Sequence, residues 1–183
     1  MQHHDVIQET AGSVTVHAVI RGLEDEVRNR EHDFETVTAT GKLANGKTKT
    51  VHYTLEVIFI NGHTYFRTTL AKNKWQKHSG LTLTDPYSGI TFHRARTTVT
   101  FNSGVHFTSV AGSPTHLKAQ QTNAGVTTNY QVWLSNGHAP YVTRELTTYV
   151  STKKGHATGS TETTFGPFNK PIVILAPTSQ GSA

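Results

Sequence analysis

Apolar and polar side chains alternate along residues 51–57, ahead of a short apolar run, and this period of two is the feature that most constrains the fold. Five apolar residues share one face of the segment: Val51, Tyr53, Leu55, Val57 and Phe59. The segment ends at Asn61-Gly62, a dipeptide that favours a two-residue type I′ turn because both positions take positive φ. A returning strand over 64–69 then places Val57 opposite Phe66. The sequence therefore predicts a long antiparallel hairpin with one apolar face.

Further strands are predicted along the rest of the chain, at 13–20, 34–39, 90–101, 105–110, 116–121, 126–134, 141–152 and 157–165. The connections are short, so neighbouring strands should be antiparallel. About a sixth of the residues are threonine, which favours pleated and half-exposed surfaces. No segment has sustained helical periodicity, although 70–79 has room for one helical turn. We expect the acidic stretch 22–30 to be a polar connection and the fold to be mainly β and antiparallel.

A chain of 183 residues supports one domain with its own core. We expect a flexible N-terminal segment at 1–12, a single β domain at 13–177 and a flexible tail at 178–183. The chain has no cysteine, which excludes disulfides, a thiolate nucleophile, an iron–sulfur cluster and a cysteine-bearing zinc site. The longest apolar runs, at 57–60 and 172–176, are far shorter than the roughly 18 residues needed to span a bilayer.

The formal charge of +5 is unevenly distributed. Residues 1–35 contain eight acidic residues and three arginines, so the remainder of the chain is basic. A basic body can attract nucleic acid or an anionic membrane surface. The basic residues are scattered singly, however, and neither an RNP-type aromatic motif nor a zinc-finger spacing is present. We therefore expect no nucleic-acid partner.

Twelve histidines raise the question of a metal site. They are spread over many predicted elements, and no His-Glu-x-x-His motif places two of them on one surface. Only His3 and His4 are adjacent, in the segment expected to be flexible. Folding could still bring distant histidines together. On sequence spacing alone we predict no metal site and no cofactor.

Catalytic motifs are also missing from the sequence. Between Glu56 and Glu145 the only carboxylate is Asp85, and there is no Gly-x-Ser-x-Gly elbow, P-loop or dinucleotide-binding glycine motif. Glu56 lies within an apolar strand and is the one carboxylate that we single out. Its simpler interpretation is a residue on the polar face of an amphipathic strand. We expect no catalytic residues and no enzymatic activity, with a hydrolase as the least favoured class.

An apolar sheet face with few helices to cover it must pack on another sheet, curl on itself or hold an apolar ligand. The residues of this face either form an ordinary core or line a ligand site, and the pattern does not separate the two. Nine residues are the candidates for the apolar ligand-binding face: Leu55, Val57, Phe59, Phe66, Tyr130, Val132, Leu134, Leu146 and Val150.

The C-terminal part of the chain resembles bacterial lipoproteins of the LppX/LprG type, which share a fold with the LolA and LolB lipoprotein carriers. The resemblance rests on the strand Tyr130-Gln131-Val132-Trp133-Leu134, on Pro140-Tyr141-Val142-Thr143-Arg144, and on the ending Phe165-Gly166-Pro167-Phe168-Asn169-Lys170-Pro171 with the apolar run after it. Upstream, the apolar strand 56–60, its glycine turn, Tyr65 and Trp75 are also similar. These landmarks occur in the family's order over residues 34–177.

The resemblance implies a strongly curved, half-open antiparallel β-barrel with little helix, LolA-like, whose concave apolar side holds a lipid or the acyl chain of a lipoprotein. It implies a non-catalytic monomer outside the cytoplasm, in the periplasm or on the outer face of the cell membrane. The family is tethered by a lipid-modified N-terminal cysteine, which this chain lacks, so membrane attachment would need a preceding segment. The alternative is a protein-binding or sensor module of the cell envelope with the same fold and no lipid ligand.

Overall fold

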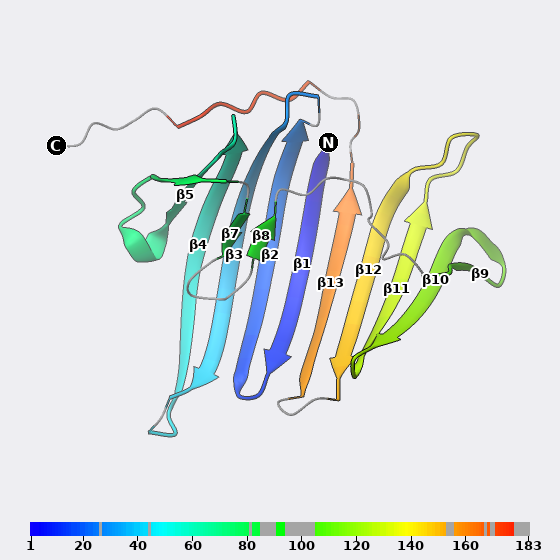
Figure 1. The fold of residues 1–183 in the computed structure, drawn as a ribbon, viewed down its shortest axis with the longest axis horizontal. Coiled ribbons are helices and arrows are strands. Elements are labelled where there is room, and N and C mark those ends of the chain that lie inside the picture. Colours follow the sequence, from blue (N-terminus) through cyan, green and yellow to red (C-terminus); the bar gives the residue numbers. More distant parts are fainter. Residues whose placement is uncertain are drawn as a thin grey trace.

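One large antiparallel sheet dominates the computed structural model (Figure 1). The structure describes residues 1–25, 27–43, 45–80, 82–84, 91–93, 105–152, 156–166, 168 and 171–177. Eleven strands follow the order β6-β5-β4-β3-β2-β1-β13-β12-β11-β10-β9, and β7 and β8 form a separate two-stranded sheet. In Figure 1 the small sheet lies in front of β2 and β3.

The strands have the following bounds: β1 (Gln2–Ala11), β2 (Val14–Asp25), β3 (Arg30–Lys42), β4 (Thr48–Ile60), β5 (His63–Thr68), β6 (Gln76–Ser79), β7 (Thr82–Thr84), β8 (Thr91–His93), β9 (Thr108–Val110), β10 (Ser113–Asn123), β11 (Val126–Leu134), β12 (Val142–Ser151) and β13 (Ala157–Phe165). A single 3₁₀ turn, Thr69–Ala71, follows β5. No helix in the described part of the chain is long and apolar enough to cross a membrane.

The sheet consists of two meanders that meet in its middle. Strands β1 to β6 form one arm, β9 to β13 form the other, and β1 pairs with β13 at the seam between them. His3 lies opposite Phe165 there, and the Gly166 amide donates to the Gln2 carbonyl at 2.9 Å. The seam therefore joins residues that are 146 to 162 positions apart in sequence.

The predicted mainly β, antiparallel architecture is confirmed. The hairpin of β4 and β5 has the predicted register, with Val57 opposite Phe66. Asn61 and Gly62 have φ values of 53° and 75°, as a type I′ turn requires. The predicted strand 90–101 lies mostly outside the described residues, of which only 91–93 form β8, and the tail 178–183 lies wholly outside them.

The N-terminal segment differs from the expectation of a flexible stretch at 1–12. Residues 2–11 form β1, the sixth strand of the eleven. Ile7 packs against the buried apolar residues of the neighbouring strands, which anchors this largely polar segment. The expected polar connection 22–30 is also shorter in the structure, because β2 extends to Asp25 and β3 begins at Arg30.

The predicted strong curvature is not observed: the sheet is open, and its edge strands β6 and β9 are not paired with each other. Curling a sheet requires bulges or glycine kinks. The pairings of β1 with β2, β2 with β3 and β3 with β4 run without a register shift over the full lengths of the strands. Shifts occur only near the far edge among the described pairings, between β9 and β10 and between β11 and β12.

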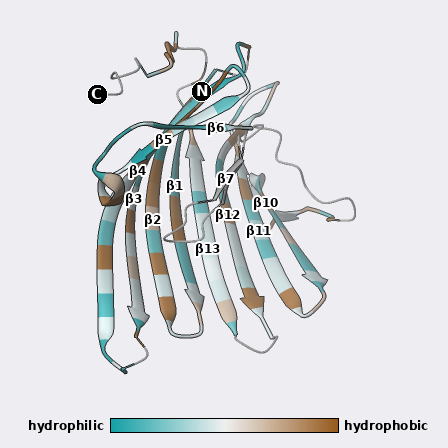
Figure 2. Ribbon diagram, turned by 60° about the vertical axis from the view of Figure 1, so that its left-hand side comes forward, coloured by the Kyte–Doolittle hydropathy of each residue, from teal (hydrophilic) through white to brown (hydrophobic). Residues whose placement is uncertain are grey.

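One face of the large sheet, here called the core face, carries the buried apolar side chains. It includes Ile20 of β2, Val37 of β3 and Val57 of β4, which lie on one face because Ile20 is paired with Glu35 and Glu35 with Leu55. Val37 and Val57 are completely buried. Apolar and polar bands alternate along β2, β3 and β4 in Figure 2, as expected for strands with one buried face.

The opposite face, here called the threonine face, is largely polar. Threonine hydroxyls contact each other across neighbouring strands, at 3.0 Å between Thr40 and Thr50 and at 3.0 Å between Thr122 and Thr127. Such cross-strand pairs explain the threonine content of the chain. The C-terminal segment covers one end of this face, where Ile174 packs against Ile58 and Ile60.

Candidate functional site

The predicted ligand-binding residues fall into separate groups. Six of them, Leu55, Val57, Phe59, Phe66, Tyr130 and Val132, lie on the core face. The first four form a cluster with Ile20 and Ile7, in which Val57 and Phe59 are fully buried. Tyr130 and Val132 lie six strands away in the other arm. The structure thus does not bring these six residues into one contact group.

Leu146 and Val150 are corrections to the predicted site. Strand pairing places Glu145 opposite Val132, so the odd-numbered residues of β12 face the core side. Leu146 and Val150 therefore point to the threonine face, where Val150 is 49% exposed. The error arose because the apolar residues of this strand were assumed to mark its buried face. Leu134 lies beyond a register shift, so alternation does not fix its face.

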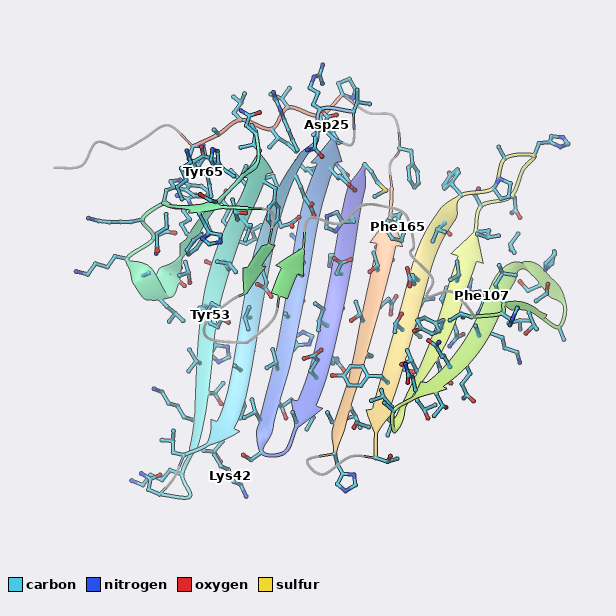
Figure 3. The ribbon with its side chains drawn as sticks, in the orientation of Figure 1. Asp25, Lys42, Tyr53, Tyr65, Phe107 and Phe165 are labelled. Atoms are coloured by element: carbon cyan, nitrogen blue, oxygen red, sulfur yellow. The ribbon has the colours of Figure 1, made fainter. Side chains whose placement is uncertain are left out.

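The core face differs between the two arms. In β2 to β4 most of its apolar residues are buried, although Val14 is 46% exposed and Ala39 and Val51 are half-buried, whereas in β10 and β11 Leu117, Ala119 and Tyr130 are all only half-buried. The Phe107 ring lies 6.4 Å from the Tyr130 ring, between centroids. Figure 3 shows Phe107 and Tyr53 at opposite arms of the sheet. The arm with β10 and β11 thus has fewer fully buried apolar side chains on this face than the arm with β2 to β4.

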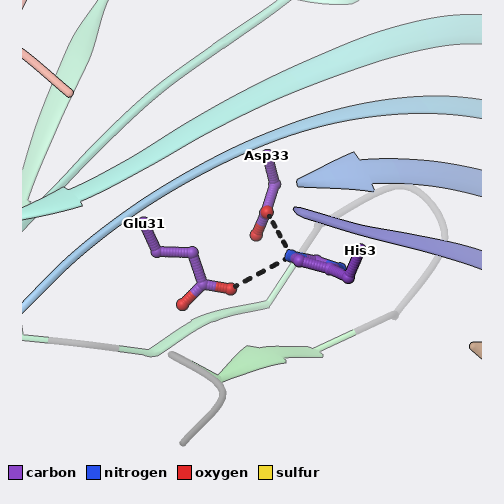
Figure 4. A group of neighbouring side chains, drawn as sticks. All are labelled: His3, Glu31 and Asp33. Carbon is purple, nitrogen blue, oxygen red and sulfur yellow. Dashed lines mark ion pairs between the residues drawn. The ribbon is translucent and has the colours of Figure 1, made fainter. Parts of the chain in front are cut away.

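Near the seam the core face becomes acidic and carries a histidine. His3 of β1 lies opposite Gly22 of β2, which lies opposite Asp33 of β3. His3 Nε2 is 3.2 Å from Asp33 Oδ1 and 3.9 Å from Glu31 Oε1 (Figure 4). One ligand atom from each of the three residues lies within 4.8 Å of the others. This arrangement could hold a metal ion.

Gly22 creates the space for this histidine. A Cβ atom on Gly22 would stand 1.8 Å from His3 Nε2 and 2.4 Å from Asp33 Oδ1. Real Cβ atoms do not approach other atoms so closely, so a side chain at this position is incompatible with the observed His3 conformation. The glycine in the middle strand therefore allows side chains from β1 and β3 to meet above it.

Asp5 fixes the orientation of the His3 ring. Its Oδ2 lies 3.2 Å from His3 Nδ1 and accepts the hydrogen bond, which turns Nε2 toward Asp33 and Glu31. Burial alone would lower the pKa of His3, but contacts with Asp33 and Asp5 outweigh it and raise this pKa to about 10. Burial, together with the charges of Asp33 and Glu24, raises the pKa of Glu31 to about 9.

Several polar atoms of the group are buried without a hydrogen bond. Glu31 Oε2 has no hydrogen-bond partner, and His3 Nε2 and Asp33 Oδ1 contact each other as an ion pair without the geometry of a hydrogen bond. Glu31 is 2% exposed and Asp33 is 4% exposed. Buried carboxylate oxygens are costly unless a cation or a donor compensates them. The group therefore combines strong burial with incomplete pairing of its ligand atoms.

The sequence argument missed this group because it considered histidines close to each other in sequence. Pairing of β1, β2 and β3 instead brings one histidine to two carboxylates about 30 residues away. A signal was present in the acidic residues Glu31, Asp33 and Glu35, whose spacing of two places all three on one strand face. The apolar Val37 two residues further marks that face as the buried one.

Glu56, the carboxylate singled out from the sequence, lies on the opposite face. Arg67 Nε donates to its Oε2 at 2.6 Å, and His32 Nε2 lies 2.8 Å from its Oε1. Its Cα partner Phe34 is exposed on the same face. Glu56 therefore pairs with charged neighbours on the threonine face, as its simpler interpretation predicted.

A shallow depression of about 510 Å³ also lies at the seam. Its lining includes His4, Arg21, His32 and Phe34 on the threonine face, together with Phe165 at the end of β13. Three of these residues offer nitrogen atoms and the other two are phenylalanines. The depression has no focused set of ligand atoms comparable with that of His3, Glu31 and Asp33.

Comparison with known proteins adds no relative: no family model, no curated protein and no solved structure matches this chain. The resemblance to LppX/LprG-type lipoproteins therefore remains a prediction based on the residues quoted for it.

Proposed function

We propose that this domain binds an apolar ligand, such as a lipid acyl chain, on the core face of the arm formed by β10 to β13. The proposal includes no catalysis. The observation that carries it is the half-buried apolar surface of Leu117, Ala119 and Tyr130, which continues into the buried Val132 on an open sheet. Apolar side chains in such a position gain from contact with an apolar ligand.

The energetics of an acyl chain fit such a surface. Each buried methylene contributes about 0.8 kcal/mol, so a segment of about eight methylenes would contribute roughly 6 kcal/mol before the cost of association. This gain in binding free energy comes from burial of methylene groups and requires no catalytic group. Threonine and tyrosine hydroxyls on the same face, at Thr128 and Tyr149, would limit how much of the face is apolar.

The fully buried residues Leu55, Val57 and Phe59 would then act as the structural core and not as contact residues. Of the nine predicted residues, Tyr130 and Val132 remain in the proposed site, and Leu117 and Ala119 are added. The resemblance to LppX/LprG-type lipoproteins supports the same ligand class. It also supports a location outside the cytoplasm, with membrane attachment through a preceding lipidated segment.

Native mass spectrometry of the purified protein, followed by organic extraction, tests the proposal directly. We expect a co-purifying lipid mass or displaceable binding of a fluorescent fatty acid. An Ala119→Trp variant should weaken fatty-acid binding at least tenfold because its indole fills the half-buried surface. Lys118→Trp places the same ring on the exposed threonine face and is the matched control.

Equal binding by the two tryptophan variants would refute the placement of the ligand. Absence of both a co-purifying lipid and fatty-acid binding would refute the function itself. The protein-binding envelope module would then be the leading interpretation.

A further inference from the structure

We propose that His3, Asp33 and Glu31 bind one divalent transition-metal ion, for which Zn²⁺ is the best-fitting example. The site lies at the seam and is independent of the proposed apolar ligand site. It would use one imidazole nitrogen and one oxygen from each carboxylate. The three side chains converge from β1 and β3 (Figure 4).

Two of the three distances between the ligand atoms are close to those around a zinc ion. With zinc–ligand bonds of about 2.0–2.1 Å in a tetrahedral arrangement, neighbouring ligand atoms lie about 3.4 Å apart. His3 Nε2 is 3.2 Å from Asp33 Oδ1 and 3.9 Å from Glu31 Oε1. Small changes of side-chain torsion would therefore complete three zinc bonds. The fourth position would be open to a water molecule.

The donor set selects the class of metal. Imidazole nitrogen is a typical ligand of Zn²⁺ and other late transition metals, whereas Ca²⁺ and Mg²⁺ prefer sites built from oxygen alone. One nitrogen and two carboxylate oxygens therefore favour a transition metal. The two carboxylates would also neutralise its double positive charge.

Two further observations support a ligand at this position. The first is the burial of Glu31, which is 2% exposed and whose Oε2 has no hydrogen-bond partner. A cation bound through Oε1 would offset the charge of this buried carboxylate. The second is Gly22, since any side chain there would fill the space into which His3 and Asp33 converge.

Asp5 would serve as a positioning residue. A histidine that binds a metal through one ring nitrogen commonly donates its other N–H to a carboxylate, which fixes the ring and strengthens the ligand. His3 has this arrangement, with Nδ1 held by Asp5 Oδ2 at 3.2 Å and Nε2 directed toward Asp33. The metal ligand His3 and the positioning residue Asp5 both lie on β1.

The test measures Zn²⁺ binding to the full chain by isothermal titration calorimetry after removal of bound metals with a chelator. We expect one Zn²⁺ per chain. His3→Gln, Asp33→Asn and Glu31→Gln should each weaken binding at least tenfold. Asp5→Asn should weaken it by about tenfold through loss of the ring orientation. Circular dichroism checks that every variant is folded.

His4→Gln is the matched control, because His4 is the next residue of β1 and points to the threonine face. Its affinity for Zn²⁺ should equal that of the unmodified protein. Co²⁺ provides a second readout that does not depend on stability: its visible absorption should show a nitrogen and oxygen ligand set, and His3→Gln should abolish this spectrum.

Three results would overturn the proposal. One is the absence of saturable Zn²⁺ binding at 100-fold molar excess, which would leave the group as a buried ion-pair cluster. Another is equal Zn²⁺ affinity in His3→Gln and the unmodified protein, which would place the ion at surface histidines. The third is Ca²⁺ or Mg²⁺ binding tighter than Zn²⁺. The fatty-acid measurements are unaffected by each of these results.

Discussion

The imidazole of His3 occupies the position that a side chain on Gly22 would need. The two residues lie opposite each other in β1 and β2, and a Cβ atom at position 22 would be 1.8 Å from His3 Nε2. Gly22 is paired on its other side with Asp33, so it lies between His3 and Asp33 in the sheet. The side chains of these two residues contact each other above it. The absence of a side chain at Gly22 therefore allows residues of β1 and β3 to meet above β2.

Substituting Gly22 with alanine should displace His3 and destabilise the protein by about 1–3 kcal/mol, the usual cost of inserting a methyl group into a packed position. Urea denaturation followed by tryptophan fluorescence measures this change. Gly41→Ala is the control, because a Cβ atom there would be 3.5 Å from its nearest neighbour, a normal contact distance. Equal stability of the two variants would contradict the assigned packing around His3.

Truncating Phe59 tests the position of the core. The side chain is completely buried among Ile20, Leu55 and Val57, so Phe59→Ala should lower the free energy of unfolding by about 3–5 kcal/mol. Phe34→Ala is the comparison, since Phe34 is 45% exposed on the other face of the neighbouring strand. We expect this variant to change stability by less than about 1 kcal/mol. A reversed order of the two effects would mean that the faces are assigned incorrectly.

Replacing Glu56 with glutamine should remove its charge-assisted contacts with Arg67 and His32 and cost about 1–2 kcal/mol. The Glu56 side chain is only 15% exposed, which limits compensation by water. Glu162→Gln also loses an ion pair, with Arg144 at 2.8 Å, but both side chains are about 40% exposed. That control should cost less than about 1 kcal/mol, and thermal denaturation measures both variants.

Glu145 should make stability depend on pH. Burial raises its pKa, and the charge of Asp5 adds to this effect, while a hydrogen bond from the Thr147 hydroxyl opposes it. The folded protein therefore binds more protons at this residue than the unfolded chain once the pH exceeds about 4.5. Its contribution to stability falls as the pH rises from there through the raised pKa.

The Glu145→Gln variant should be more stable than the unmodified protein at neutral pH and should lose part of this pH dependence. Urea denaturation at several pH values between 4 and 8 measures both effects. The two proteins should converge toward the acidic end of this range, where Glu145 is protonated in both states. A constant difference at all pH values would contradict an electrostatic cause.

Local sequence signals predicted the elements whose partners are near in sequence. The turn at Asn61-Gly62 and the alternation before it determine the register of β4 and β5, because only two and four residues separate the members of the two pairs nearest the turn. The strands Val126–Leu134 and Ala157–Phe165 have the predicted bounds for the same reason. Composition added the expectation of a polar, threonine-rich face.

Long-range pairing was beyond the reach of this reasoning. Nothing local to His3 indicates that it will lie beside Asp33, since the contact depends on the registers of β1, β2 and β3 together. Hydrophobicity also misassigned β12, because pairing with both neighbours directs Thr147 and Glu145 to the core side and Leu146 away from it. In that strand the neighbours override the strand's own amphipathic pattern.

The pairing of β1 with β13 has a kinetic consequence for the chain during its synthesis. Each arm can form from hairpins between consecutive strands, but the seam has to wait until residues 157–165 have left the ribosome. Until then β1 exposes an unpaired edge with Val6 and Ile7 at its centre. A circular permutant that links the C-terminal segment to Met1 would place β13 shortly before β1 in the chain, and it should fold faster than the natural order of strands.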